Sequence, residues 1–479
     1  MDRIEPQNVK GFRDLRPREA YRKNEIISTI RRVYESYGFL PLETPGLEYL
    51  DILLGEYGEE NTKQIFRFKS PEEQQIALRF DLTVPLARVV AQYNDLPKPF
   101  KRYQVGSVWR ADKPDPGRFR EFTQFDVDVV GASSQLAEAE VISAVVKSLQ
   151  EIGVWDFTVR VNSRRALDAM MEKAGIPPEK QKDVLRILDK LYKIGIINVQ
   201  AELTDGRIDA SGDHIEGIGL GELKSQLVIG YFQITNDKLK FGRTERKKVL
   251  EFMTENFGEG SCSDLRDLDT YLNILGLDSE TVAFDPTIAR GLDYYTGPVF
   301  EVNLNEKPQF GSVAGGGRYD SLVRRFTGVD LPAVGFSIGI DRLLTAIGDE
   351  NDYIDSVDVV VTIMERERLD EYLRMADELR ANGVRVDLYL GDDKSLRKQL
   401  QYADKVNARL SLIVGSNEFE RGVVTVKRLR SVPTLGRQIA DRTEWLKKSR
   451  EKQLEIPRKD LGTEIKRLLS EGPLLITLE

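Results

Sequence analysis

One stretch of the chain could place cations, an amide and carboxylates on a single face. If residues 119–130 form a regular strand, alternate side chains point the same way. The side chains that would share this face are Arg118, Arg120, Phe122, Gln124, Asp126 and Asp128. An antiparallel sheet that keeps one polar face in water gives the same pattern. The strand alone therefore fits a binding site and a solvated surface equally well.

Four further segments combine arginines, acids and glycines, and together they favour a site. They are residues 79–83, 290–297, 315–320 and 334–342. Glycines within strands let a ligand approach the backbone closely. The last segment predicts a strand followed by a helix whose first turn presents Arg342, and both features favour an anion. Each segment by itself could be a turn, a bulge or an ion pair.

Cys262 is the only cysteine and His214 the only histidine among the 479 residues. An intramolecular disulfide is therefore impossible, and zinc sites built from Cys and His or Ser-His-Asp nucleophilic systems lack the residues they need. Both residues lie in Gly-rich or Ser-rich stretches and are expected to be exposed. The chemistry must rest on carboxylates, cations and backbone groups.

The composition predicts a soluble protein of two to four domains. The amino terminus lacks the apolar stretch of a signal peptide, and no segment is apolar for long enough to span a bilayer, so the cytoplasm is the expected location. The net charge of −8 argues against indiscriminate nucleic-acid binding but allows a local basic surface.

The elements that would position these residues form a mainly antiparallel sheet flanked by helices. Apolar spacing predicts two amphipathic helices, at 19–37 and 135–152. Strands are predicted at 76–80, 100–110 and 119–130, with a Pro/Gly turn between the last two. Residues 39–50 are interrupted by two prolines and should be extended.

The remaining chain divides into an insertion, a small domain and a tail. Residues 164–261 have helical patterns and are expected to interrupt the first domain. From about residue 355 to residue 445, strands alternate with helices, which is typical of a small α/β domain. Residues 446–479 are charged and partly helical, and we expect a tail.

Taken together and in this order, these segments resemble the class II aminoacyl-tRNA synthetases, and specifically the histidyl-tRNA synthetase family. Residues 38–50, with Pro45, are similar to the first class signature, which builds a dimer interface. Residues 100–131 are similar to the second and 335–342 to the third. Residues 290–295 and 315–319 resemble the two signatures peculiar to the histidine enzymes.

The resemblance implies a role for each matching residue. Arg110 would contact the α-phosphate of ATP and the carboxylate of histidine, with the catalytic Arg290 also near the α-phosphate. Other residues implied to bind ATP are Asp112, Arg118 and Arg342. Besides Arg110, those implied to bind histidine are Asp81, Leu82, Thr83, Gln124, Asp128, Arg290, Tyr294 and Tyr295, of which Asp128 and the two tyrosines would surround the imidazole. Asp81 and Asp128 stand where bacterial relatives often have Glu.

The resemblance further implies a catalytic domain over 1–350, interrupted by the 164–261 insertion, and an anticodon-binding domain over 355–445. The expected activity is ATP-dependent activation of L-histidine and its transfer to tRNA(His). ATP would be a substrate, Mg²⁺ would be held through it, and the enzyme would be a homodimer. For RNA contact, residues 394–437 carry ten basic and three acidic side chains, although a solvated face would look the same.

Two other functions are compatible with parts of this pattern. A non-catalytic histidine sensor, the synthetase-like regulatory subunit of histidine biosynthesis, shares the fold. Such paralogues typically lack the C-terminal domain and have degraded arginine motifs, whereas both features are intact here. A synthetase-like module of a larger kinase would need fused domains that this chain lacks.

Overall fold

The computed structural model describes residues 3–54, 63–209, 212–238, 244–289, 295–348, 357–393, 395–429, 431–432, 453–471 and 474–475. The chain divides into two compact units, of which the larger ends at Gly348 and the smaller takes in residues 349–479 together with Arg16–Tyr21. None of the described helices is long and apolar enough to cross a membrane.

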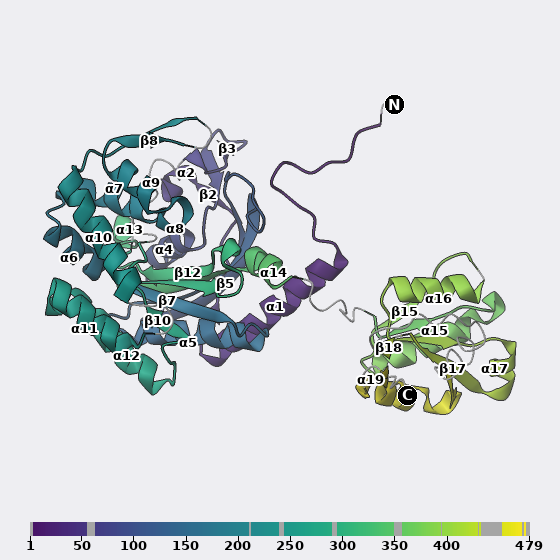
Figure 1. Ribbon diagram of the computed structural model, residues 1–479. Helices are drawn as coiled ribbons and strands as arrows, with labels where there is room; N and C mark the ends of the chain where they lie inside the picture. Colours follow the sequence, from purple (N-terminus) through teal and green to yellow (C-terminus); the bar gives the residue numbers. More distant parts are fainter. Residues whose placement is uncertain are drawn as a thin grey trace. The chain divides into compact units, whose positions relative to one another are not determined.

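An eight-stranded sheet forms the centre of the larger unit (Figure 1). Its strands, in spatial order, are β1 (Leu40–Pro41), β5 (Phe100–Trp109), β6 (Glu121–Val130), β13 (Ala333–Gly339), β12 (Ser312–Arg318), β11 (Pro298–Leu304), β7 (Phe157–Ser163) and β10 (Val282–Phe284). The six central strands are antiparallel, and only the two short edge strands pair in parallel. The mainly antiparallel sheet predicted from the sequence is confirmed.

Helices cover one face of this sheet, because one set of alternate side chains along its strands is apolar. Phe125, Val127 and Val129 of β6 belong to the main hydrophobic core, which they share with side chains of several helices. Most of the helical side chains in this core come from α1 (Pro17–Ser36), α5 (Leu136–Glu151), α11 (Arg246–Phe257), α12 (Ser263–Ile274) and α14 (Ile340–Ile347). The two helices predicted at 19–37 and 135–152 are therefore α1 and α5.

The other face carries a smaller layer that includes the 79–83 segment. Its elements are β2 (Leu47–Tyr49), α2 (Leu50–Leu53), β3 (Arg67–Lys69), β4 (Gln75–Leu78), α4 (Thr83–Gln92) and α13 (Arg324–Thr327). Side chains of α2, β4 and α4 share a second core with Phe100 and Val130 of the large sheet.

The residues expected as an insertion belong to two different cores. Buried side chains of residues 167–232 form a core of their own. The elements of this region are α6 (Arg164–Lys173), α7 (Pro178–Leu188), α8 (Leu191–Ile194), α9 (Ile196–Leu203), β8 (Gly206–Ile208), β9 (His214–Glu216) and α10 (Glu222–Lys238). In contrast, α11 and Cys262 of the 3-10 helix η1 (Glu259–Cys262) pack into the main core. The expectation that Cys262 is exposed is wrong, whereas His214 is exposed as predicted.

The smaller unit has a five-stranded sheet of its own. Its strands, in spatial order, are β15 (Val386–Leu388), β14 (Val359–Val361), β16 (Leu410–Ile413), β17 (Val423–Arg428) and β19 (Gln453–Pro457). Its helices are α15 (Leu369–Ala381), α16 (Leu396–Lys405), α17 (Ser416–Arg421) and α19 (Leu461–Ser470), and a short pair joins β18 (Ser431–Val432) to β20 (Leu474–Leu475). The alternating strands and helices predicted here are present.

Residues expected as a tail are part of this smaller unit. β19 pairs with β17 along five residues, from Val423↔Pro457 to Lys427↔Gln453. Leu461, Ile465 and Leu468 of α19 are buried in the same core as α15. A helical signal was visible in the sequence, but the pairing of β19 depends on contacts with a strand that is distant along the chain.

Candidate functional site

The polar face of the β5–β6 hairpin is buried within the protein. The register places Arg102 opposite Asp128 and Gln104 opposite Asp126, so these four side chains share a face. Asp126 and Asp128 are each only 2% exposed. The alternative of a polar face turned to water is therefore wrong for this strand.

Asp128 lies between a cation and a hydrogen-bond donor. Its Oδ2 is 2.9 Å from Nη2 of Arg102, and its Oδ1 accepts a 2.5 Å hydrogen bond from the hydroxyl of Tyr319. Burial raises the pKa of Asp128, and the Arg102 guanidinium opposes that rise. A side chain at Gly335 would place its Cβ 1.9 Å from Oδ1 of Asp128, so this position of β13 must be glycine for the carboxylate to lie there.

Asp126 is the second buried carboxylate on this face. Burial raises its pKa to about 7, an effect that the Arg102 guanidinium opposes and the Asp128 carboxylate reinforces. Both carboxylates therefore interact with the Arg102 guanidinium. The sequence pattern placed Asp126 on this face without a role and did not reveal Arg102. The cross-strand pairing of residues 102 and 128 depends on the register of the hairpin.

The turn at residues 79–83 is tied to β5. Asp81 accepts hydrogen bonds at Oδ1 from the backbone N–H groups of Thr83 and Val84, at 3.1 and 3.0 Å, and so caps the start of α4. The carbonyl of Leu82 accepts from Nη2 of Arg102 at 3.1 Å. These bonds hold the backbone of residues 81–84 beside the carboxylates of β6.

Gln124 ends the polar row of β6 with an unused acceptor. Its Nε2 donates to the hydroxyl of Ser337 on β13 at 2.7 Å. Its Oε1 is buried, and no donor within the described part of the chain bonds to it. Since a buried carbonyl without a donor is costly, this oxygen suits a ligand that brings an N–H group.

Arg110, at the end of β5, is fixed by aromatic rings and by the same turn. Its guanidinium carbon lies 4.3 Å from the ring centre of Phe80 and 5.3 Å from that of Phe122. Its Nε donates to the Phe80 carbonyl at 3.1 Å. A guanidinium held in this way is oriented before an anion arrives.

The turn between β5 and β6 brings the other predicted phosphate-binding residues together. Nε and Nη2 of Arg118 lie 2.8 and 2.7 Å from Oδ2 of Asp112. Gly117 neighbours Arg342, since a Cβ on Gly117 would lie 3.6 Å from Cγ of Arg342. Arg342 itself donates to the Ser312 carbonyl at 2.8 Å. The sequence therefore identified three residues, Asp112, Arg118 and Arg342, that lie on neighbouring segments of the structure.

The 290–297 segment is only partly described. Arg290 and Tyr294 lie outside the described residues, so their predicted roles stay predictions. Before them, Nδ2 of Asn162 donates to the carbonyls of Pro286 and Ile288 at 3.1 and 2.8 Å. After them, Tyr295 packs against Gly317, where a Cβ would come within 2.9 Å of its ring.

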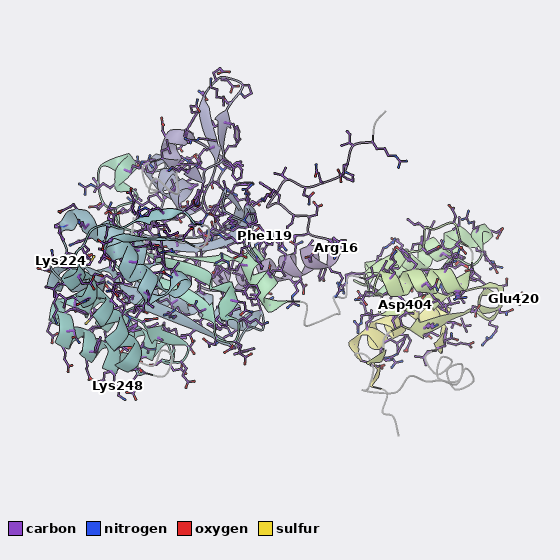
Figure 2. All side chains as sticks on the ribbon, turned by 45° about the horizontal axis from the view of Figure 1, so that its top comes forward. Arg16, Phe119, Lys224, Lys248, Asp404 and Glu420 are labelled. Carbon is purple, nitrogen blue, oxygen red and sulfur yellow. The ribbon has the colours of Figure 1, made fainter. Side chains whose placement is uncertain are left out.

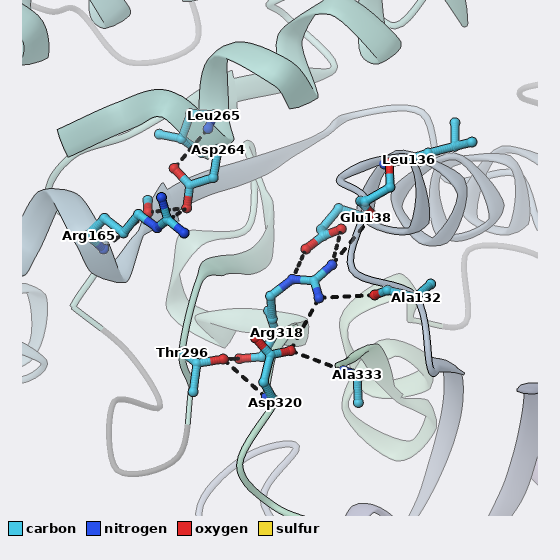
Figure 3. Close-up of polar contacts among 12 residues, drawn as sticks. Ala132, Leu136, Glu138, Arg165, Asp264, Leu265, Thr296, Arg318, Asp320 and Ala333 are labelled. Atoms are coloured by element: carbon cyan, nitrogen blue, oxygen red, sulfur yellow. Dashed lines mark hydrogen bonds and ion pairs between the residues drawn. The ribbon is translucent and has the colours of Figure 1, made fainter. Parts of the chain in front are cut away.

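A buried ion pair anchors the glycine-rich strand β12 (Figure 3). Nε and Nη2 of Arg318 bond to the two carboxylate oxygens of Glu138, at 2.5 and 2.8 Å, and Nη1 donates to the Ala132 carbonyl at 3.1 Å. Burial raises the pKa of Glu138, whereas the bonds from Arg318 lower it. The pair fixes Arg318 immediately before Tyr319, the donor to Asp128.

The basic residues of the smaller unit are partly paired with acids outside the 394–437 window. Lys398 lies 2.5 Å from Asp393, Arg428 lies 2.5 Å from Glu471, and Arg421 pairs with Glu455. The excess of positive charge counted from that window alone is therefore reduced in the folded unit. Figure 2 shows Asp404 and Glu420, two acids of the window, among the side chains at the surface of the smaller unit.

Gln399, also in this window, has a structural role. Its amide side chain is fully buried, donates to the Ile363 carbonyl and accepts from the Ile363 N–H, each at 2.8 Å. It joins α16 to the end of β14 and is not a surface contact.

Two family models together match most of the chain. Residues 11–343 match the model described as histidyl-tRNA synthetase, and residues 358–468 match an anticodon-binding domain. The second match extends into the residues that were expected to be a tail.

Similar proteins and structures span nearly the whole chain. Proteins named histidine–tRNA ligase from Ruegeria sp. and Cereibacter sphaeroides are each 40% identical, over 96% and 97% of this chain and 95% and 98% of their own. A crystal structure of histidyl-tRNA synthetase from Nostoc sp. is 32% identical and has a TM-score of 0.75, covering 97% of this chain and all of that one. The chain belongs to the histidyl-tRNA synthetase family.

Proposed function

We propose that this chain is a histidine–tRNA ligase. It activates L-histidine with ATP, forming histidyl-adenylate and pyrophosphate, and then transfers histidine to tRNA(His) with release of AMP. The observation that carries this proposal is the buried Asp128, a carboxylate on the same hairpin as the fixed cation Arg110. One group suits an imidazole N–H and the other a phosphate or a carboxylate.

Histidine would be bound through both of its ends. Asp128, Tyr294 and Tyr295 would surround the imidazole. Asp81, Thr83 and Gln124 would bind the α-amino group. Leu82, which lies between Asp81 and Thr83 on their turn, would also contact histidine. The unused Oε1 of Gln124 supports this assignment, because an ammonium group would supply the missing donor.

ATP would lie along the arginines of the second and third class signatures. Arg110 would contact the α-phosphate and the histidine carboxylate, Arg118 with Asp112 the outer phosphates and the adenine, and Arg342 the γ-phosphate. The contact between Gly117 and Arg342 supports a shared site for these groups. Mg²⁺ would enter with ATP as part of the substrate. Any protein ligands of this Mg²⁺ stay unassigned.

Activation is an in-line attack of the histidine carboxylate on the α-phosphorus of ATP, with pyrophosphate as the leaving group. The nucleophile is already an anion at neutral pH, so no general base is needed. Catalysis then consists of positioning and of stabilising charge on the phosphate oxygens. Arg110 and Arg290 would supply that stabilisation.

The smaller unit would bind the anticodon region of the tRNA. Arg397 and Lys405 are exposed on α16, and Lys427 on β17 is half-buried. Lys394, Arg430 and Arg437, also expected to contribute, lie outside the described residues. RNA binding through phosphates needs several such cations together.

The active enzyme would be a cytoplasmic homodimer. Large apolar side chains are exposed on the small three-stranded sheet, at Leu47 and Tyr49 of β2 and at Phe68 of β3. Exposed apolar groups gathered on one layer are typical of interaction sites. Light scattering on the wild type and on Tyr49→Asp should give a dimer and a dissociated form respectively.

ATP–pyrophosphate exchange, run separately with each common amino acid, tests the proposed activity. Histidine alone should support exchange. Charging of tRNA(His) in the same preparation should follow. Binding of histidine without exchange would instead indicate a regulatory histidine sensor.

A further inference from the structure

Arg102 is a buried cation whose contacts join the segments proposed to bind histidine. Its side chain is 0% exposed and is one of the largest fully buried side chains among the described residues. A charged group is costly to bury unless it is paired and hydrogen-bonded. The partners of Arg102 therefore indicate what its burial achieves.

Those partners come from two separate segments. One is Asp128, whose Oδ2 is 2.9 Å from Nη2 of Arg102. The other is the Leu82 carbonyl, which accepts from the same nitrogen at 3.1 Å. Nη1 also donates to Oε1 of Gln104 on the same strand, at 3.4 Å. One guanidinium thus fixes a carboxylate of β6 and the turn that contains Asp81 and Thr83.

The charge of Arg102 matters as much as its geometry. Asp126 and Asp128 face it from β6, and both are almost fully buried. Burial raises the pKa of Asp128 and the Arg102 guanidinium opposes that rise, so loss of this cation would favour the protonated form further. A neutral carboxyl accepts a hydrogen bond from an imidazole N–H less strongly than a carboxylate does.

We infer that Arg102 is a positioning residue for histidine: its ion pair fixes the Asp128 carboxyl group, and its bond to the Leu82 carbonyl holds the 81–83 turn beside that group. The inference rests on the proposed function, which places histidine between these two segments. Arg102 acts through Asp128 and Leu82. Its loss should weaken recognition of histidine and leave that of ATP almost unchanged.

Two substitutions separate its contributions. Arg102→Met has a side chain of similar length but lacks the charge, the ion pair with Asp128 and the hydrogen bonds to the Leu82 carbonyl and Gln104. It should raise the histidine KM and the Kd for L-histidine on the order of 10²-fold, as expected for lost hydrogen bonds to a charged group. Arg102→Lys restores the charge without the forked geometry and should recover part of that loss. The ATP KM should stay within about twofold in both variants.

Arg246→Met is the matched control. Arg246 is also buried and multiply bonded, to Asp269, Asn273 and the Val282 carbonyl, but on α11 in the main core. Its replacement should lower thermal stability without a selective change in the histidine KM. A rise in the histidine KM in this control as large as in Arg102→Met would overturn the inference.

Calorimetric titration with L-histidine keeps the test independent of catalysis. If the wild type binds histidine but shows no exchange, the proposed activity fails, while the Kd values of the variants still decide the role of Arg102. If Arg102→Met does not fold, Arg102→Lys alone tests the inference, and its Kd for L-histidine should be about 10-fold higher than that of the wild type. The effect of Arg102→Lys on the Kd for L-histidine should also be non-additive with the effect of Asp128→Asn. Unchanged histidine affinity in Arg102→Lys, or equal weakening of ATP and histidine, would refute the inference.

Discussion

The raised pKa of Asp126 predicts that this carboxylate destabilises the folded protein as the pH rises. Its pKa is about 7 in the folded protein, against 3.8 for an ordinary Asp. Below about pH 4 both states hold the proton, so the residue makes no difference. Between about pH 4 and 7 the unfolded chain releases the proton and the folded one keeps it, so the stability falls as the pH rises. Three units at about 1.4 kcal/mol each give a penalty of roughly 4 kcal/mol, complete above pH 7.

Asp126→Asn removes this titration and should show the penalty directly. Near pH 4 the variant and the wild type should differ least, and above pH 7.5 the variant should gain relative to the wild type by up to about 4 kcal/mol, or several degrees in Tm. Scanning calorimetry over this pH range measures the difference in stability between the two proteins, read from the unfolding of the larger unit. Glu121→Gln removes an exposed carboxylate from the same strand and controls for the loss of one charge. A difference between Asp126→Asn and the wild type that is constant with pH would contradict the reasoning.

Three further predictions concern the reaction. Gln124→Leu removes the unused acceptor and should raise the histidine KM about 10- to 100-fold with little change for ATP; an unchanged KM in pyrophosphate exchange would contradict its contact with the α-amino group. Arg290→Ala should lower kcat for adenylation on the order of 10²- to 10³-fold, by analogy with loss of one oxyanion donor, and should affect transfer from preformed adenylate less. Equal losses in the two steps, resolved by rapid quench, would count against a role at the phosphate. A chain ending near Asp349 keeps the larger unit and should retain some exchange but lose most tRNA charging; full charging would show that the smaller unit does not read the anticodon.

The sequence predicted those features that depend on neighbouring residues. The spacing of apolar residues located α1 and α5, and alternation located β5 and β6, because each pattern is local. The family signatures led to Arg110, Arg118 and Arg342, which gather on adjoining segments.

Features that depend on distant partners could not be predicted in this way. The pairing of Arg102 with Asp128 requires the register across a hairpin turn, and one residue of slip would turn either side chain to the other face. The burial of Cys262 depends on the packing of α11 against the main core. The acids that neutralise Arg421 and Arg428, Glu455 and Glu471, lie in a part of the sequence that had been assigned to a tail.

The position of β19 and α19 in the smaller unit has a consequence for synthesis on the ribosome. All of the larger unit precedes residue 349, so it can emerge and fold while the rest is still being made. The smaller unit, in contrast, lacks the edge strand β19 of its five-stranded sheet and one wall of its core until residues 453–468 have left the ribosome. A chain that terminates shortly before this point would carry a complete larger unit beside an unfinished one, with the edge of β17 open to pairing with other chains.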